Sequence, residues 1–173
     1  YGYVVKDFVR DKDSIQALLL ISEIANLGKR RGLTLYDYLM VLYEEHGYFK
    51  EDLVNIVLEG EAGERKIKEI IEYFRENKPT SILGLRVFKV EDYLTRTRYF
   101  EKHTDPIDLP ISNVLKFVLE DGSWFVLRPS GTEPKIKFYI SVNTTLDNVT
   151  AFETTEQKLE SKIDAIVNDM KLN

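Results

Sequence analysis

The hydrophobic pattern of the first 47 residues predicts two helices. Over residues 13–31, apolar side chains recur at three- and four-residue intervals, at Ile15, Leu18, Leu19, Ile24 and Leu27. Asp13 or Ser14 can cap the start of this helix, and Gly28 and Gly32 mark its end. A second helix begins after Thr34 and closes at Gly47. Its apolar face is formed by Leu35, Leu39, Leu42 and Tyr43.

The pattern changes after Gly47, where strands and helices mix. The apolar run at residues 53–58 predicts a strand, and a short helix follows, which Pro79 stops. The apolar positions of this helix are Ile67, Ile70, Ile71 and Phe74. From Gly84 onward the residues favour extended segments.

A hairpin is the clearest local prediction in the second half of the chain. Residues 114–120 and 123–128 flank Asp121-Gly122, a residue pair typical of a two-residue β-turn. The next strand has one apolar face, formed by Ile136, Phe138, Ile140 and Val142. Lys135 and Lys137 lie opposite that face. The chain closes with a helix that carries an apolar stripe of Leu159, Ile163, Ile166, Val167 and Met170. This order of elements predicts an α+β domain in which helices cover one face of an antiparallel sheet.

Composition narrows the class of function. Acidic residues outnumber basic ones by 29 to 24, and the net charge of −5 argues against a nucleic acid partner, whose phosphates require basic surface. The longest apolar run, at residues 17–21, is too short to span a membrane. The absence of cysteine excludes disulfides and thiol catalysis. With no signal segment visible, we expect a cytoplasmic location, although a periplasmic protein would also suit this composition.

The segment Arg128-Pro129-Ser130-Gly131-Thr132-Glu133-Pro134-Lys135 concentrates groups that can hold a phosphate. Arg128 can donate two parallel hydrogen bonds, and Ser130 and Thr132 offer hydroxyls. Gly131 can take a positive φ that lets successive backbone amides point into one concavity. The alternative is an ordinary connecting turn, because these are also common turn residues. The glycine and lysine spacing is not that of a Walker loop.

The same segment resembles the phosphate-binding loop in the last domain of the α-D-phosphohexomutases, the phosphoglucomutase and phosphomannomutase family. Other segments resemble the family in the same order, namely Tyr1-Gly2-Tyr3, Arg10-Asp11-Lys12-Asp13, Gly32-Leu33-Thr34-Leu35, Val90-Glu91-Asp92-Tyr93 and Asp105-Pro106-Ile107-Asp108-Leu109-Pro110. The resemblance implies a TATA-binding-protein-like C-terminal domain, the fourth of the family, at residues 48–173. Residues 1–47 would be the end of the third domain, an α/β domain. Such a remnant exposes apolar surface over residues 13–31, which predicts association or mobility.

The activity that the resemblance implies is the interconversion of hexose 1-phosphate and hexose 6-phosphate. A phosphoserine transfers its phosphoryl group to the sugar, glucose 1,6-bisphosphate or a similar bisphosphorylated sugar is the intermediate, and Mg²⁺ assists. The Ser-His-Asn and Asp-Gly-Asp motifs that supply the serine and hold the metal are absent from this sequence. The sugar-recognising Glu-Glu-Ser segment would fall before Tyr1. We therefore expect N-terminal domains of the same polypeptide to supply these groups and expect this piece to be inactive alone.

The resemblance also implies which residues touch the substrate. The family's contacts to the phosphate that does not react carry over to Arg128, Ser130, Gly131 and Thr132. Lys137 lies near a position where many members have a further basic residue, although Lys135 and Lys137 also fit the solvated face of a strand. Lys12 resembles a lysine that approaches the sugar in some phosphoglucomutases. The alternative for Lys12 is a charge cluster at the start of a helix.

Other interpretations of the sequence stay open. Four acidic residues suggest a cation site, but their positions near helix starts and prolines favour capping and turn roles: Asp11, Asp13, Asp105 and Asp108. The whole chain could instead be a standalone, non-catalytic module that binds a phosphosugar or serves in assembly. A third possibility is a structural domain with an incidental turn at residues 128–135.

Overall fold

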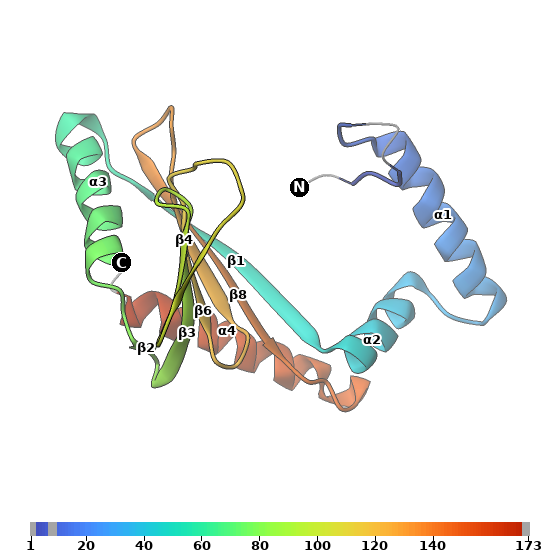
Figure 1. Cartoon of the computed structure of the whole chain (residues 1–173). Helices are drawn as coiled ribbons and strands as arrows, with labels where there is room; N and C mark the ends of the chain where they lie inside the picture. Colours follow the sequence, from blue (N-terminus) through green and yellow to red (C-terminus); the bar gives the residue numbers. More distant parts are fainter. Residues whose placement is uncertain (1–2, 7–9, 171–173) are drawn as a thin grey trace. The chain divides into compact units, whose positions relative to one another are not determined.

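The computed structural model describes residues 3–6 and 10–170 of the chain (Figure 1). Tyr1 and Gly2, which belong to one of the resembling segments, lie outside the described residues. The chain divides into two compact units. The first unit comprises Tyr1–Gly47 and Thr145–Val149, and the second comprises Tyr48–Thr144 and Thr150–Asn173.

The first unit contains the two helices that the sequence predicts. Helix α1 spans Ser14–Arg30, and the Asp13 side chain caps it by accepting hydrogen bonds from the backbone N–H groups of Ile15 and Gln16. Helix α2 spans Leu35–His46 and starts with a capping box, in which Thr34 and Asp37 each accept from the other's backbone N–H. The backbone and side-chain hydrogen bonds from Thr34 lower the pKa of Asp37.

Helix α1 leaves much of its apolar surface exposed. Ile15 is 79% exposed and Leu18 is 66% exposed, and further exposed positions along the helix are Leu19, Ile21, Ile24 and Leu27. The side where α1 meets α2 is packed, because Gly28 is buried and lies close to the backbone of Leu33 and the ring of Tyr38. The periodicity of α1 therefore predicts its helical form correctly, but most of its apolar stripe has no cover within the described residues.

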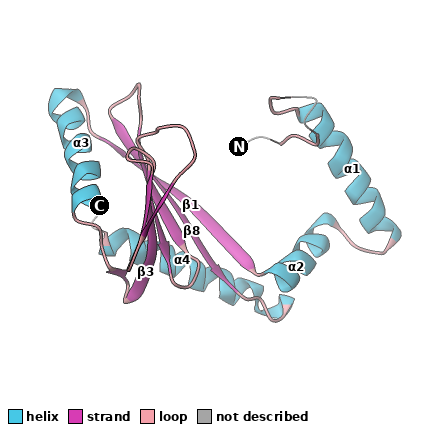
Figure 2. Ribbon diagram, viewed as in Figure 1, coloured by secondary structure: helices cyan, strands magenta, loops and turns pink. Residues whose placement is uncertain are grey.

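The second unit is an eight-stranded antiparallel sheet packed with two helices (Figure 2). The strands are β1 (Tyr48–Val57), β2 (Ser81–Ile82), β3 (Leu85–Asp92), β4 (Thr97–Phe100), β5 (Thr104–Pro106), β6 (Leu115–Leu119), β7 (Trp124–Pro129) and β8 (Lys135–Thr144). Their order across the sheet is β1-β8-β7-β6-β3-β4-β5, and β2 pairs with β3. This confirms the predicted α+β class.

Helices α3 (Gly60–Glu76) and α4 (Phe152–Asp169) pack against strands β1, β7 and β8, and a short 3₁₀ turn at Val149–Ala151 precedes α4. The alternating residues of β8 that face the helices are almost fully buried, namely Ile136, Phe138, Ile140 and Val142. Leu127 and Phe125 of β7 continue this core. From α4, Leu159, Ile163 and Ile166 are buried, as its stripe predicts. The opposite face of β7 and β8 carries Arg128 and Lys137.

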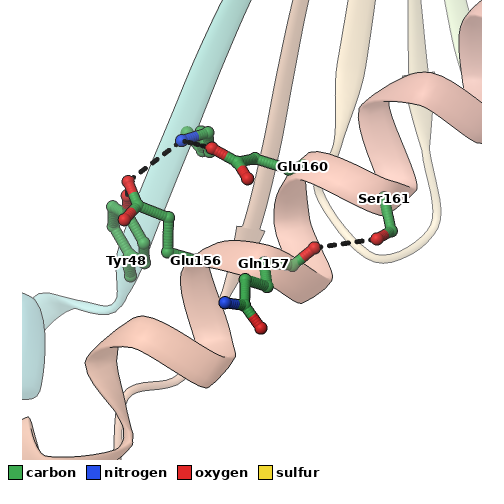
Figure 3. A network of polar contacts seen from close by, with 6 residues as sticks. Tyr48, Glu156, Gln157, Glu160 and Ser161 are labelled. Atoms are coloured by element: carbon green, nitrogen blue, oxygen red, sulfur yellow. Dashed lines mark hydrogen bonds and ion pairs between the residues drawn. The ribbon is translucent and has the colours of Figure 1, made fainter.

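Polar contacts join α4 to the edge strand β1 (Figure 3). The Tyr48 hydroxyl donates to Glu156 over 3.1 Å, and the Lys50 ammonium lies 3.0 Å from Glu156 and 2.9 Å from Glu160. The hydrogen bond to Glu160 is the largest of the effects that raise the pKa of Lys50. These contacts fix the start of β1 to the first turns of α4.

Strand β1 is longer than the sequence predicts. It starts at Tyr48 and not at residue 53, and ten consecutive residues pair with β8. The start of the strand could not be recognised in the sequence, because the charged run Lys50-Glu51-Asp52 interrupts the alternation of apolar and polar residues that is typical of a half-buried strand.

None of the helices within residues 3–6 and 10–170 has the length and apolarity that a membrane crossing requires.

Candidate functional site

The predicted phosphate loop connects β7 to β8 as a tight turn. Pro129 pairs with Ile136 at the end of the ladder, and the Ser130 N–H donates to the Lys135 carbonyl over 2.8 Å. Within the turn, the Thr132 N–H donates a long and therefore weak hydrogen bond of 3.5 Å to the Ser130 hydroxyl. Hairpin pairing therefore brings Ser130, Gly131 and Thr132 to the tip of the connection.

Arg128 and Lys137 are direct cross-strand partners one position before the loop. Because Leu127 and Ile136 point into the core, Arg128 and Lys137 lie on the opposite face of the sheet. Arg128 is exposed and Lys137 is half-buried. Among the described residues, neither side chain forms an ion pair with a carboxylate. Two cations thus stand side by side at the base of the loop.

The loop tip borders a cavity of about 340 Å³ on the side of helix α3. Loop residues 129–134 form one wall, and Glu64, Ile67 and Lys68 of α3 form the other, with Asn113 at the edge. Arg128 is not part of this lining. The structure therefore brings Ser130, Gly131 and Thr132 together in one wall and leaves Arg128 on the other face of the sheet.

The expectation for Gly131 needs correction. Glycines with positive φ in the described residues are Gly32, Gly47, Gly60, Gly84 and Gly122, and Gly131 is not among them. The hairpin pairing of β7 and β8 closes this loop without a left-handed residue at Gly131. A Cβ at this position would meet no heavy atom within 4 Å, so the glycine leaves open space above the loop.

Lys135 has a local partner that the sequence analysis did not assign. Its ammonium forms an ion pair with Glu133 across the turn. The hydrogen bond and charge of Lys135 lower the pKa of Glu133, and the charge of Lys137 adds to this effect. Lys135 is thus paired with Glu133. Among the described cations of β7 and β8 beside the loop, Arg128 and Lys137 have no such carboxylate partner.

Lys12 belongs to the first unit, where it is exposed and lies 3.4 Å from Asp11. Of the four candidate cation ligands, Asp13 caps α1, Asp105 lies 3.8 Å from His103, and Asp108 pairs with Arg96 over 3.2 Å. Within the part of the chain that the structure describes, no three His, Asp or Glu side chains gather into a group that could hold a metal ion.

The α3 wall of the cavity was not predicted from the sequence. Glu64, Ile67 and Lys68 follow the spacing of one helical face, so the helix pattern placed them together but gave no sign of what they face. Asn113 lies in the connection before β6 and reaches the cavity only through tertiary packing. A local sequence pattern contains no signal for that position.

Comparisons with known proteins agree with the fold. Residues 53–158 match the family model described as phosphoglucomutase/phosphomannomutase, C-terminal domain. The chain is 42% identical over 165 residues to a phosphoglucomutase of Staphylococcus haemolyticus (strain JCSC1435), covering 94% of this chain and 29% of the relative. It is 41% identical over the same length and coverage to a phosphoglucomutase of Staphylococcus aureus (strain MRSA252). This chain thus spans under a third of the length of these curated relatives.

Among solved structures, the chain is similar to the open form of the exocytosis-sensitive phosphoprotein pp63/parafusin, a phosphoglucomutase from Paramecium. That similarity covers 92% of this chain and 28% of the other chain, with 20% sequence identity and a TM-score of 0.49.

Proposed function

The chain belongs to the phosphoglucomutase/phosphomannomutase family, and on this premise we propose that its β7–β8 loop holds the phosphate of a hexose phosphate. The contacts in this proposal are Arg128, Ser130, Gly131 and Thr132, with Lys137 as a further cation. The observation that carries it is the cross-strand pair of Arg128 and Lys137. Like charges directly opposite each other on a sheet repel, and a bound dianion between them relieves that repulsion.

The loop tip complements this pair of cations. Ser130 and Thr132 carry hydroxyls that can donate to phosphate oxygens, and the free space above Gly131 admits a ligand close to the backbone. The family resemblance assigns these positions to phosphate contacts. Lys12, in the first unit, is a candidate sugar or phosphate contact by the same resemblance.

The role that we propose for this grip is positioning. Binding energy at the phosphate that does not react orients the hydroxyl at the other end of the sugar, which raises the rate of the transfer step. In the longer protein, the reaction interconverts hexose 1-phosphate and hexose 6-phosphate through a phosphoserine and a bisphosphorylated sugar. We place the phosphoserine and the magnesium site in N-terminal domains of the longer protein, because the family's Ser-His-Asn and Asp-Gly-Asp motifs do not occur in this sequence. The chain alone is expected to give no turnover.

The same proposal assigns the two parts of the chain. Residues 1–47 are the end of the third domain of the family, and residues 48–173 are the C-terminal domain. The exposed apolar surface of α1 supports this assignment, because a helix from the middle of a larger domain has neighbours on most of its sides. The cytoplasmic location stays a prediction.

Calorimetric titration of the chain with glucose 1-phosphate tests whether the β7–β8 loop binds a phosphate group. We expect a dissociation constant on the order of millimolar, because most of the contacts to the sugar belong to other domains. A charge-assisted hydrogen bond contributes about 1.5–3 kcal/mol, so Arg128→Ala should weaken binding by about tenfold to a hundredfold.

Arg86→Ala is the matched control, because Arg86 is an exposed arginine of the same sheet that is already paired with Glu101 and Glu120. Its removal should leave the affinity for glucose 1-phosphate unchanged. Equal affinity of the unchanged chain and Arg128→Ala would refute the proposed grip.

A further inference from the structure

A second cavity lies beside strand β3, where this strand changes its partner along one edge. The start of β3 pairs with β2, and its second half pairs with β4. A cavity of about 300 Å³, here called the β3 edge cavity, is lined by residues 78–80, 86–90 and 99–101. No residue of the loop at 128–135 contributes to this lining. The β3 edge cavity is therefore separate from the proposed phosphate site.

A β-bulge in β3 presents Phe88 to this cavity. The pairing of β3 with β6 shifts register between Val87 and Lys89, and Phe88 has no partner in the ladders with β6 and β4. The Phe88 side chain lines the cavity and is 46% exposed although it is apolar. Bulges are frequent beside binding sites, where they re-aim a single side chain. The bulge thus gives the cavity an aromatic wall.

Phe100 extends this aromatic wall and is held between two other rings. The Phe88 ring lies edge-on to it at a centroid distance of 5.8 Å, and the His103 ring stacks on it at 4.4 Å. Aromatic rings prefer edge-to-face or offset-stacked contacts with one another. A flat aromatic ligand can therefore add a further ring to this set.

Lys78 supplies a cation to the same cavity. Its ammonium lies 4.4 Å from the centroid of the Tyr99 ring and donates to the Arg75 carbonyl in the last turn of α3. Among the described residues, Lys78 forms no ion pair with a carboxylate. An ammonium has three N–H donors, so the hydrogen bond to the carbonyl leaves two for a ligand.

The charges around the β3 edge cavity favour a ligand with a single negative charge. Counted with the ion pairs that they form, the charged lining residues comprise four cations and three carboxylates: Lys78, Arg86, Lys89 and Arg98, and Glu91, Glu101 and Glu120. One positive charge therefore remains without a counterion. Glu101 belongs to the lining itself and would repel a second negative charge on a ligand.

We propose that the β3 edge cavity binds an aromatic carboxylate, with its ring against Phe88 and Phe100 and its carboxylate on the Lys78 ammonium. Pro79, Val87 and Val90 add apolar surface to the lining, a list that completes the contacts available to the ring. The volume is at the lower end for pockets that bind small molecules, which suits a small aromatic acid better than a nucleotide. Binding at this cavity requires neither Arg128 nor the loop beside it.

The probes 1-naphthoate and its neutral analogue 1-naphthamide separate the contribution of the charge from that of the ring. Their affinities for the 173-residue chain are measured from amide chemical shifts during titration. We expect a dissociation constant on the order of millimolar for 1-naphthoate and binding about tenfold weaker for 1-naphthamide, because the charge-assisted hydrogen bond to Lys78 is lost. Equal affinities for the two probes would overturn the proposal.

The positions of the shifted amides locate the probe. We expect the largest changes at residues 86–90 and 99–101, which line the β3 edge cavity. Changes confined to α1 would place the probe on the exposed apolar surface of that helix and would overturn the assignment to the cavity.

Lys78→Met removes the ammonium and keeps most of the apolar stem of the side chain. It should weaken binding of 1-naphthoate by about tenfold and leave the affinity for 1-naphthamide within about twofold. Lys102→Met is the matched control, because Lys102 is an exposed lysine in the turn between β4 and β5 and lies outside the lining. It should change neither affinity. An unchanged affinity for 1-naphthoate in Lys78→Met would rule out the proposed carboxylate contact.

Phe88→Ala tests the aromatic wall without disturbing the contact of Lys78 with α3. It should weaken binding of both probes by about threefold to tenfold, since each loses one aromatic contact. The control is Phe49→Ala, which removes an exposed aromatic side chain from β1 of the same sheet and should leave both affinities unchanged. Equal losses in the two variants would mean that the probes bind exposed apolar surface in general, and the proposed site would fail.

Discussion

Gly63 and Gly131, both in the second unit, differ in how much space surrounds them, so replacing each by alanine should affect stability differently. A Cβ on Gly63, in α3, would lie 1.8 Å from the Leu58 carbonyl oxygen, which is backbone and cannot move aside alone. We expect Gly63→Ala to lower the free energy of unfolding by about 1–3 kcal/mol, as overpacking does in a tight interior. Urea unfolding followed by the fluorescence of Trp124, the single tryptophan, measures this effect.

Gly131→Ala is the control for that prediction. Its Cβ meets no heavy atom within 4 Å and its φ is not positive, so the unfolding midpoint should hardly change. Equal destabilisation by the two substitutions would mean that α3 does not pack on Leu58 as the structure has it.

The buried ion pair between Asp92 and Arg75 should contribute strongly to stability. Asp92 has no exposed surface and accepts from the Arg75 guanidinium over 3.0 Å and from the Leu94 N–H over 3.0 Å. Removing one partner of a buried pair leaves the other charge without compensation, so Asp92→Ala should cost about 3–5 kcal/mol. Asp108→Ala breaks an exposed pair with Arg96 and should cost at most about 1 kcal/mol. Urea unfolding of both variants makes the comparison, and similar costs would contradict the burial of Asp92.

At the scale of elements, the docking of α4 on β1 should depend on pH. The hydrogen bonds from Lys50 and Tyr48 lower the pKa of Glu156 below its ordinary value of 4.5. A carboxyl with a depressed pKa stabilises the folded state fully above its unfolded pKa, and this stabilisation is lost as pH falls through the folded value. Stability should therefore decline below about pH 4.5, and Glu156→Gln should remove part of that decline.

Urea midpoints between pH 7 and pH 3, again followed by Trp124, test this prediction. Glu156→Gln should lower the midpoint at pH 7 and shrink the difference between pH 7 and pH 3. Glu153→Gln, an exposed carboxyl in the first turn of the same helix, is the control and should leave the pH dependence unchanged. An identical acid dependence in the Glu156→Gln variant and the unchanged chain would rule out the role assigned to these contacts.

The elements differ in how far the sequence predicts them. Helix α2 and the β6–β7 hairpin follow from local chemistry, because Thr34 with Asp37 caps the helix and Asp121-Gly122 forms the turn. The start of β1 could not be predicted from its charged residues. Lys50 is accommodated there by Glu156, which is 106 positions away in the sequence. Such long-range compensation leaves no local pattern.

The candidate site shows the same division. The loop at residues 128–135 is recognisable from residue type and spacing, and its place between two strands is confirmed. The separation of Arg128 from the cavity could not be foreseen, since it depends on which face of the sheet α3 covers. Asn113 enters the cavity wall only through its contact with Arg75, which joins residues 38 positions apart.

At the scale of the whole molecule, the apolar surface of α1 should cause self-association. Ile15, Leu18 and Leu19 are exposed neighbours on one side of this helix. Sedimentation velocity should show a sedimentation coefficient that rises with protein concentration. Replacing both leucines, by Leu18→Glu and Leu19→Glu, should abolish that rise.

Ile111→Glu is the control for association, because Ile111 is an equally exposed apolar residue of the second unit. It should leave the concentration dependence in place. A chain that sediments as a monomer at all concentrations would contradict the prediction that the exposed apolar surface of α1 causes self-association.

If the β7–β8 loop is a phosphate site, crystals of the chain soaked in inorganic phosphate will show it. We expect a phosphate ion in contact with the Arg128 guanidinium and the hydroxyls of Ser130 and Thr132. The ion should be absent from crystals of Arg128→Ala that are soaked in the same way. A loop without phosphate at saturating concentration, or an ion that persists in Arg128→Ala, would refute the proposed phosphate site.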